Sequence, residues 1–384
     1  MKQRRFTFIH MLTAVLAGIL ATLLVLWLLL GSQSVSLLTA WGAVRTRFVG
    51  EYDPDTAMDS ALRGMVAGLG DRWSYYLNAE ESAYQRERED NRYVGIGVTA
   101  GKEDERGLFL LQVYSGGPAE EAGLKVGEVI TAVDGVSAAG ETGQESALEA
   151  IKGEEGTEVT LTVMDAAGRF REVQVTRRAI QGQLVRYELL DTDVGYVAVS
   201  NFYTDCAQQF RSAVDDLVEQ GAVGLVFDMR NNGGGYVHEL TDMLDYLLPE
   251  GPIFRSQDVM GLEEVIQSDE NYVNLPMATL VNRDTYSAAE IFAAQLQESA
   301  GAAIVGEETS GKGYSQQPVY LPNGGELHLS TGKYTTGAGV SLVGTGVSLD
   351  ARVELTEEES LALWTGQLGH EEDAQLQKAL ELLK

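Results

Sequence analysis

The chain has 384 residues, with 57 acidic and 28 basic side chains and a formal net charge of -29. Such an acidic chain argues against nucleic acid as a partner, because phosphate binding needs clustered lysine and arginine. The length predicts two or three domains. Because Cys206 is the single cysteine, an internal disulfide is excluded, and no Cys/His cluster has the spacing of a zinc site.

The N-terminus has the pattern of a membrane anchor. Residues 1–5 are rich in lysine and arginine, and residues 6–30 carry no charged side chain. At about 1.5 Å per residue, such a run spans a bilayer core of about 30 Å. A cleaved signal peptide has a shorter apolar core, and no convincing cleavage site follows. We expect residues 1–31 to form a cytoplasmic tip and a single-pass anchor in the cytoplasmic membrane, with everything after it outside.

Residues 32–91 are expected to form a juxtamembrane linker followed by N-terminal helices. Asp53 before Pro54 has the pattern of an N-cap followed by proline at the first helical position. Five apolar side chains then share one helical face: Met58, Leu62, Met65, Val66 and Leu69. The charge-rich run 80–90 predicts a second helix with a solvated face.

Residues 92–178 contain strand-like runs separated by short helical segments. Two stretches, residues 116–130 (GGPAEEAGLKVGEVI) and 133–135 (VDG), resemble a PDZ domain. That resemblance implies a loop whose backbone N–H groups hold the C-terminal carboxylate of a peptide. Paired glycines allow successive amides to point into one concavity. The loop residues are Gly95, Ile96, Gly97 and Val98. The alternative is a small β-domain with a glycine-rich turn.

Residues 179–384 alternate apolar strands with helical segments, which is typical of βαβ organisation around a partly parallel sheet. The apolar strand 223–228 leads into the glycine-rich loop 230–235, at the edge where open α/β sheets bind ligands. This loop lacks the Gly-Lys-Ser/Thr ending of a phosphate loop. We therefore expect its glycines to present backbone N–H groups.

Ser287 follows the short apolar run 278–281 and therefore falls at a strand-to-helix turn. A hydroxyl there lies beside free N–H groups that suit a developing negative oxygen. Lys312 lies between two glycines, and a desolvated lysine can be the base that a serine nucleophile needs. The alternatives are an N-capping serine and a solvated lysine. A triad using one of the four histidines also stays open, because triads are recognised in space.

Together these segments resemble the C-terminal processing peptidases, which are tail-specific serine peptidases. Three stretches carry the resemblance. Residues 228–235 (DMRNNGGG) match the family's Asp-Leu-Arg-Asn-Asn-Pro/Gly-Gly-Gly, residues 286–290 (YSAAE) match Ala-Ser-Ala-Ser-Glu, and residues 311–316 (GKGYSQ) match Gly-Lys-Gly-x-x-Gln. Residues 65–76 are similar to the family's N-terminal helix and turn, and residues 373–382 to its closing helix.

The resemblance implies a role for each matched position. Ser287 would be the nucleophile, Lys312 the general base, and Gln316 the group that orients the lysine. The backbone N–H groups of Gly234 and Ala288 would stabilise the oxyanion. No metal or cofactor is implied. The chain departs from the family at residues 283–286, 336–339 and 349–350, which bears on the shape of the cleft rather than on the chemistry.

We therefore expect an α/β peptidase core at 179–384, an inserted PDZ domain at 92–178 and an N-terminal transmembrane helix. The function expected is that of a membrane-anchored serine endopeptidase, which captures protein C-termini and cuts an adjacent segment by acyl transfer. The alternative is a catalytically inactive PDZ scaffold or sensor of C-terminal tails. The partners implied are proteins or peptides with free C-termini and the membrane. The sequence leaves a homodimer open and does not name the natural substrate.

Overall fold

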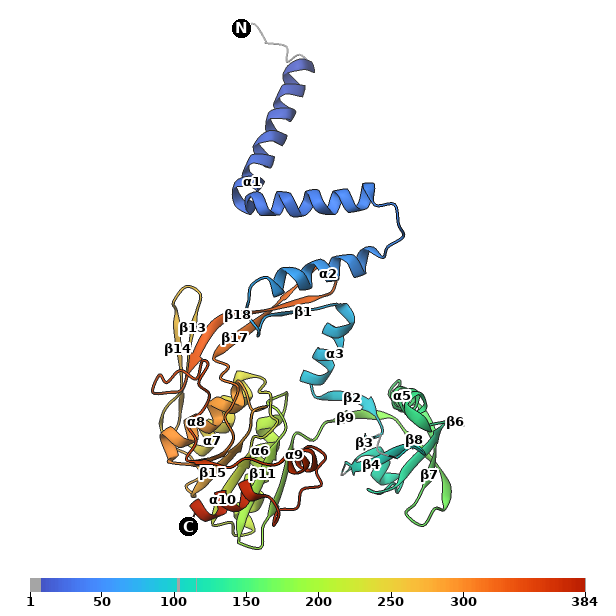
Figure 1. The fold of residues 1–384 in the computed structure, drawn as a ribbon, viewed down its shortest axis with the longest axis vertical. Helices are drawn as coiled ribbons and strands as arrows, with labels where there is room; N and C mark the ends of the chain where they lie inside the picture. The colour runs from blue at the N-terminus through green and yellow to red at the C-terminus, as the bar shows by residue number, and fades with distance from the viewer. Residues whose placement is uncertain (1–7, 102–103, 115, 384) are drawn as a thin grey trace, which may run out of the picture. The chain divides into compact units, whose positions relative to one another are not determined.

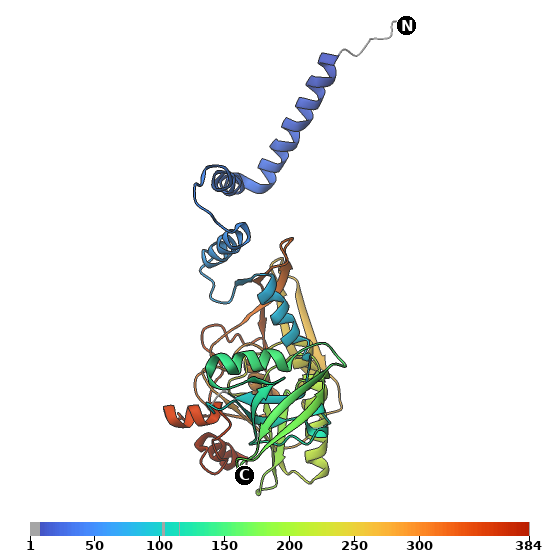
Figure 2. The same cartoon turned by 90° about the vertical axis from the view of Figure 1, so that its right-hand side faces the viewer.

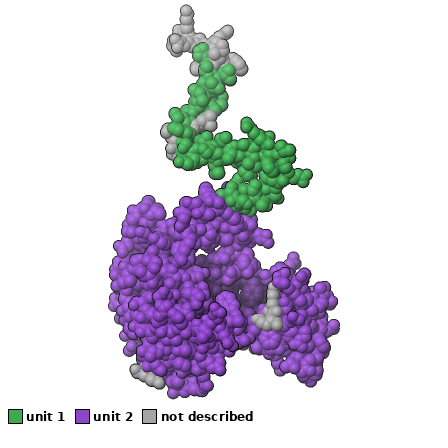
Figure 3. All heavy atoms as spheres, viewed as in Figure 1, with its two compact units in different colours: residues 1–62 green, residues 63–384 purple. Residues whose placement is uncertain are grey.

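The computed structural model describes residues 8–101, 104–114 and 116–383, without the side chains of residues 8, 9, 23, 26 and 28–30. The chain divides into two compact units, residues 1–62 and 63–384 (Figure 3). The first unit holds α1 (Phe8–Arg47) and the start of α2 (Pro54–Ala67). The predicted N-cap of α2 is confirmed, because Asp53 Oδ1 accepts hydrogen bonds from the backbone N–H groups of Asp55 and Thr56, both at 2.8 Å.

Helix α1 is interrupted at Gly31, which has φ 74° and ψ 172°. Its two halves run in different directions in both views (Figures 1 and 2). Within the described residues no helix combines the length and the apolar character needed to cross a bilayer. The predicted transmembrane helix is therefore not supported by the described residues, and residues 1–7, which include its basic flank, lie outside them.

The segment from Arg92 to Gln181 folds as a β-rich domain, as predicted. Its sheet has the order β3-β4-β5-β7-β8, with β6 paired to β5, and β3 lies at one edge. The strands are β3 (Val98–Gly101), β4 (Leu108–Val113), β5 (Val129–Val133), β6 (Val136–Ser137), β7 (Glu158–Met164) and β8 (Phe170–Thr176). Helices α4 (Pro118–Glu121) and α5 (Gly140–Ile151) complete the domain, and β2 (Arg92–Gly95) pairs with β9 (Arg178–Gln181) at its two ends.

The peptidase-like core is built on a sheet with the order β10-β11-β12-β15-β16-β19. All neighbours from β11 onward are parallel, and β10 pairs antiparallel with β11. The strands are β10 (Val185–Leu189), β11 (Val194–Val199), β12 (Gly224–Asp228), β15 (Met277–Val281), β16 (Ala303–Gly306) and β19 (Ala351–Arg352). Every residue of β12 and β15 is buried, as expected for central strands of a parallel sheet covered on both faces. The predicted βαβ organisation is confirmed.

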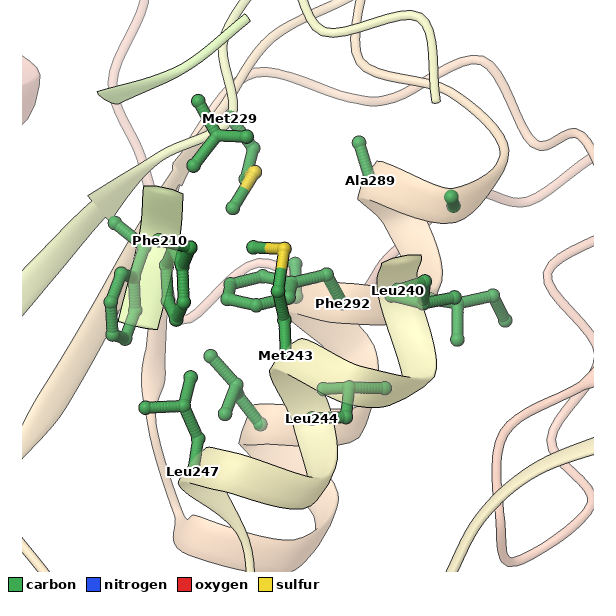
Figure 4. Packing of buried hydrophobic residues seen from close by; sticks show 14 of the residues in the cluster. Phe210, Met229, Leu240, Met243, Leu244, Leu247, Ala289 and Phe292 are labelled. Carbon is green, nitrogen blue, oxygen red and sulfur yellow. The ribbon is translucent and has the colours of Figure 1, made fainter. Parts of the chain in front are cut away.

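Helices cover both faces of this sheet. The helices are α6 (Cys206–Glu219), α7 (Val237–Leu247), α8 (Ala288–Ala300) and α10 (Ala374–Leu382). Phe227 packs in the cluster formed with α6, α7 and α8, where Phe210 and Phe292 are fully buried (Figure 4). Its neighbour Val226 packs instead with side chains of α10. This alternation along one strand places α10 on the opposite face of the sheet.

A second sheet has the order β1-β18-β13-β14, with β17 also paired to β18. Its strands are β1 (Tyr75–Leu77), β13 (Gly251–Asp258), β14 (Glu263–Ser268), β17 (Tyr314–Tyr320) and β18 (Glu326–Thr335). Helices α3 (Ala79–Glu89) and α9 (Glu357–Trp364) complete the described elements. β1 joins β18 antiparallel, and the segment just before β1 contacts β17, because the side chain of Gln316 donates to the carbonyl of Trp73. These contacts position one wall of the site described next.

Candidate active site

Ser287 lies between β15 and α8 in an unusual backbone conformation, with φ 62° and ψ -124°. A non-glycine residue held at positive φ costs about 1–3 kcal/mol, which the surrounding structure must supply. Two contacts hold the turn. The hydroxyl of Thr285, which is fully buried, donates to the carbonyl of Met229 at 2.8 Å, and the N–H of Tyr286 donates to the carbonyl of Asn232 at 3.1 Å. The serine turn is therefore fastened to the glycine-rich loop after β12.

Lys312 lies in the loop between β16 and β17. Both flanking glycines are needed there: a Cβ atom at Gly311 would lie 2.8 Å from the backbone N of Gly344, and one at Gly313 would lie 2.4 Å from a methyl of Val343. The half-buried Lys312 Nζ donates to Gln316 Oε1 at 2.9 Å. Burial lowers the pKa of Lys312 below its ordinary value, against opposing attraction from the charges of Asp71 and Glu290.

Tyr334, on β18, brings the serine and the lysine loop together. Its hydroxyl donates to the carbonyl of Lys312 at 2.7 Å and lies 3.3 Å from Ser287 Oγ. Burial raises the pKa of Tyr334, so its hydroxyl stays protonated. Among the described residues no hydrogen bond joins Lys312 Nζ directly to Ser287 Oγ, and the ammonium group is held by Gln316. Such catalytic contacts commonly tighten only when substrate binds.

The predicted oxyanion donors lie beside Ser287. A Cβ atom at Gly234, whose φ is +85°, would lie 2.8 Å from Ser287 Cβ and 3.0 Å from the backbone N of Ala288. The N–H of Ala288 is at the first position of α8, where the helix provides no acceptor for it. The N–H of Gly234 donates to Asn232 Oδ1 at 2.8 Å. The backbones of Gly234 and Ala288 thus both lie beside Ser287, and the N–H of Gly234 is already hydrogen-bonded to Asn232.

Glu290 is a site residue that the sequence reasoning missed. Its carboxylate is fully buried and accepts hydrogen bonds from the N–H groups of Ser287 (3.0 Å), Gly311 (2.8 Å) and Lys312 (3.0 Å), and from the hydroxyl of Thr309 (2.5 Å). Burial raises the pKa of Glu290, while these hydrogen bonds oppose the shift. A glutamate three positions after an N-cap serine is a capping-box signal that could have indicated the first of these contacts.

The N-terminal segment before β1 also reaches the lysine, and sequence reasoning gave it no role. Trp73 accepts a hydrogen bond from Gln316 Nε2 at its carbonyl oxygen. The centre of its ring lies 5.1 Å from Lys312 Nζ, and that of the Tyr286 ring lies 5.9 Å away. The ammonium group of Lys312 thus lies near two aromatic rings, one from the segment before β1 and one from the residue next to Ser287.

A buried network of ion pairs supports the glycine-rich loop that follows β12. Arg230 contacts Asp228 at 2.5 Å and Asp373 at 2.7 Å, and all three are almost fully buried. Burial alone would raise the pKa of Asp228, but the charge and hydrogen bonds of Arg230 hold it below its ordinary value. Asp373 is also the N-cap of α10. The motif residues Asp228 and Arg230 therefore support the loop and do not contact Ser287.

The four residues predicted to bind a peptide carboxylate run from the end of β2 into β3. The carbonyl of Ile96 accepts from Ala119 N at 2.8 Å, and that of Gly97 accepts from Tyr114 N at 2.9 Å. Gly97 has φ +80°, a conformation that favours glycine. Val98 begins β3, the edge strand of its sheet, and an edge strand can accept an added peptide strand.

Three described histidines pair with carboxylates away from Ser287. The pairs are His238 with Glu239, His328 with Glu326, and His370 with Glu188. In the described part of the chain, no group of three histidine, cysteine or acidic side chains is placed to hold a metal ion. Cys206 is buried, and burial raises the pKa of its thiol. The described contacts thus gather Lys312, rather than a histidine, next to the serine turn.

The fold and the site define a class: an α/β core with a serine at a strained strand-to-helix turn, joined to a β-rich domain with an open edge strand. Comparison with known proteins gives the same result. Residues 193–353 match peptidase family S41, and residues 109–164 match a PDZ domain. The carboxy-terminal processing protease CtpA of Bacillus subtilis (strain 168) is 30% identical over 368 residues, which cover 93% of this chain and 78% of that protein.

Two further proteins extend the comparison. The chloroplastic C-terminal processing peptidase of Tetradesmus obliquus is 29% identical, over 82% of this chain and 72% of its own length. A solved structure from Bacteroides fragilis NCTC 9343, described as a candidate S41 protease, has a TM-score of 0.57 at 19% identity and covers 88% of this chain and 92% of its own; it supports the fold alone. The chain belongs to peptidase family S41, the C-terminal processing peptidases, which are serine proteases.

Proposed function

We propose that this protein is a serine endopeptidase that captures protein C-termini through its PDZ domain and cleaves by a Ser287–Lys312 mechanism. One observation carries the proposal: Lys312 Nζ is half-buried, is held by Gln316 at 2.9 Å, and belongs to the loop that Tyr334 joins to Ser287. A lysine whose pKa is lowered by burial provides a neutral amine more readily than a solvated one. Gln316 accepts from the ammonium group and so fixes its direction.

The reaction proceeds in two steps. Ser287 Oγ bonds to the carbonyl carbon of the scissile peptide while its proton passes to Lys312 Nζ. The tetrahedral intermediate then collapses, the C–N bond breaks, and the proton on Nζ passes to the leaving amine. Water attacks the resulting ester with Lys312 again taking the proton, and that proton returns to Ser287 as the acyl group leaves.

The negative oxygen of the intermediate is stabilised by backbone N–H groups. Ala288 supplies one at the N-terminus of α8, where the helix dipole also favours negative charge. Gly234 supplies the second after its N–H turns away from Asn232 Oδ1. This requirement fits a site that completes its donor set when substrate arrives.

Substrate capture is assigned to the PDZ domain. The free C-terminus of a protein adds as a strand along β3, and its carboxylate is held by the N–H groups of the loop Gly95–Ile96–Gly97–Val98. An adjacent unfolded segment of the same protein then reaches Ser287. Names of relatives that refer to C-terminal processing agree with this substrate class.

The decisive experiment incubates the purified full chain with an unfolded protein that carries a free C-terminal tail. Cleavage that depends on Ser287, and is lost in Ser287→Ala, supports the proposal. Binding of the tail without cleavage in the unchanged chain would favour the second candidate, a catalytically inactive PDZ scaffold or sensor.

The location stays a prediction from sequence, because the uncharged run 6–30 is the feature that indicates a single-pass anchor with the catalytic part outside the cytoplasmic membrane. Fractionation of cells that make the full chain tests it: recovery without detergent would contradict an anchor.

A further inference from the structure

The segment from Asp71 to Ser74 covers the lysine without taking part in the serine turn. Asp71 shapes this segment, since its carboxylate accepts from the N–H of Trp73 (3.1 Å) and from the hydroxyls of Ser74 (2.6 Å) and Ser330 (2.7 Å). The hydroxyl of Ser74 in turn accepts from the N–H of Ser330, a β18 residue, at 3.0 Å. The segment is therefore a folded turn tied to β18, and not a loose linker.

Trp73 is fastened to the lysine loop from two sides. Arg72 donates to the carbonyl of Ser310, two residues before the lysine, at 2.6 Å, and its guanidinium lies 4.2 Å from the centre of the Trp73 ring. The carbonyl of Trp73 accepts from the amide of Gln316, whose oxygen holds Lys312 Nζ. The Trp73 and Tyr286 rings, with centres 5.8 Å apart, both lie within 6 Å of that ammonium group.

We propose that Trp73 is a positioning residue for the reaction: its ring shields Lys312 Nζ from water, and its carbonyl oxygen orients Gln316. This inference rests on the proposed Ser287–Lys312 function and deepens it. An amide accepts through its oxygen and donates through its nitrogen, so anchoring the nitrogen on Trp73 aims the oxygen at the lysine. The N-terminal segment therefore supplies part of the base's environment.

Two effects of the ring on Lys312 oppose each other. Displacing water disfavours the ammonium form, whereas the face of an aromatic ring attracts a cation. Burial is the largest influence on the pKa of Lys312 and lowers it, so we take water exclusion as the main effect of the ring. Of the charged groups nearby, Asp71 and Glu290 favour the ammonium form, while Arg72 packs on the Trp73 ring and donates to Ser310.

The experiment measures the ionisation of Lys312 directly, in full-length chains carrying Ser287→Ala so that turnover plays no part. Trace labelling with acetic anhydride at a series of pH values, followed by mass spectrometry of the peptide containing Lys312, gives the midpoint of its titration. The chains compared carry Trp73, Trp73→Leu or Trp73→Ala. Leucine retains an apolar cover without an aromatic face, and alanine opens the site to water.

We expect Trp73→Ala to move the Lys312 midpoint to higher pH, and Trp73→Leu to leave it where it is or lower it. In chains that retain Ser287, the rising limb of rate against pH should move in the same direction, with the rate at high pH less affected. An unchanged or lowered midpoint in Trp73→Ala would overturn the inference. Should alanine unfold the chain by circular dichroism, Arg72→Ala, which releases the ring without removing it, should raise the midpoint by a smaller amount.

The two proposals fail separately. A raised midpoint in Trp73→Ala together with cleavage that survives Lys312→Arg would sink the Ser287–Lys312 mechanism and leave the shielding role intact. Cleavage that requires Lys312, together with an unchanged Lys312 midpoint in Trp73→Ala, would support the Ser287–Lys312 mechanism and overturn the shielding role of Trp73.

Discussion

The peptide-binding loop of the PDZ domain and the candidate active site of the core are built in different ways. The loop Gly95–Val98 is continuous in sequence, and its local partners, Tyr114 and Ala119, lie within about 25 residues of it. The active site joins segments near residues 73, 234, 287, 312 and 334, and Glu290, at its centre, is fully buried. The loop presents backbone to an open strand edge, whereas the site encloses its side chains.

This difference predicts how substitutions affect the PDZ loop and the candidate active site. A loop that binds through backbone N–H groups depends on conformation more than on side-chain identity. A site that holds a base of lowered pKa depends on each group that excludes water or supplies a hydrogen bond. Substitutions in the core should therefore abolish turnover, and changes at the PDZ loop should affect capture.

The largest effect is expected at Lys312. Lys312→Arg keeps the positive charge, but a guanidinium stays protonated and cannot accept the serine proton. Loss of general-base catalysis costs roughly 10²–10⁴-fold. Peptide cleavage by Lys312→Arg should therefore fall about as far as that of Ser287→Ala, with the fold retained by circular dichroism. Lys333→Arg, on the neighbouring strand β18, is the matched control and should remain active. Turnover near that of the unchanged chain in Lys312→Arg would mean that another group activates Ser287.

A smaller but still large loss is expected at Glu290. Glutamine has the same shape but offers an NH2 group to some of the four donors that now face the carboxylate. Leaving buried donors unsatisfied costs about 1–3 kcal/mol, which appears as lower stability and lower kcat. Thermal unfolding and cleavage rates measure both. Glu308→Gln, at an exposed ion pair with Arg352, should change neither, and equal behaviour of the two variants would contradict the role given to Glu290.

Changes at the PDZ loop should have a smaller effect than changes in the core, and that effect should appear in KM rather than in kcat. Capping the substrate's C-terminal carboxylate as an amide removes the anion that the loop amides bind, so KM should rise while kcat stays the same. Gly97→Ala strains a residue at φ +80° and should act in the same direction. Gly168→Ala, at a positive-φ turn between β7 and β8, is the control for strain alone. Equal KM values for free and amidated tails would remove the PDZ domain from substrate selection.

The smallest effect is a shift in pH dependence. The neutral amine of Lys312 is the active form, so the rate should rise with pH through an ionisation below that of an ordinary lysine, because burial lowers this pKa. The negative charge of Asp71 opposes that shift. Asp71→Asn should therefore move the rising limb to lower pH, and the pH–rate profile of the two chains measures the displacement. A limb that moves to higher pH would show that the hydrogen bonds of Asp71 matter more than its charge.

Many secondary-structure elements could be predicted from local sequence patterns. The apolar runs at β12 and β15 predicted buried strands, and both strands are buried at every residue because parallel sheets are covered on two faces. Asp53 before Pro54 predicted the start of α2, since capping involves only neighbouring residues. The run 6–30 predicted a transmembrane helix, but the described residues contain no such span.

The sequence by itself determined the elements and the short motifs, because strand, helix and turn preferences act over a few residues. It indicated Ser287 and Lys312 as candidates in this way, and Gln316 through the resemblance to a family motif. Only the tertiary structure decided what surrounds them. The carboxylate of Glu290 accepts from the N–H of Lys312. The ring of Trp73 lies near the ammonium group because β1 pairs with β18, about 250 residues later in the chain. Burial and the pKa shift that follows from it are properties of packing, and packing brings together residues that no local pattern connects.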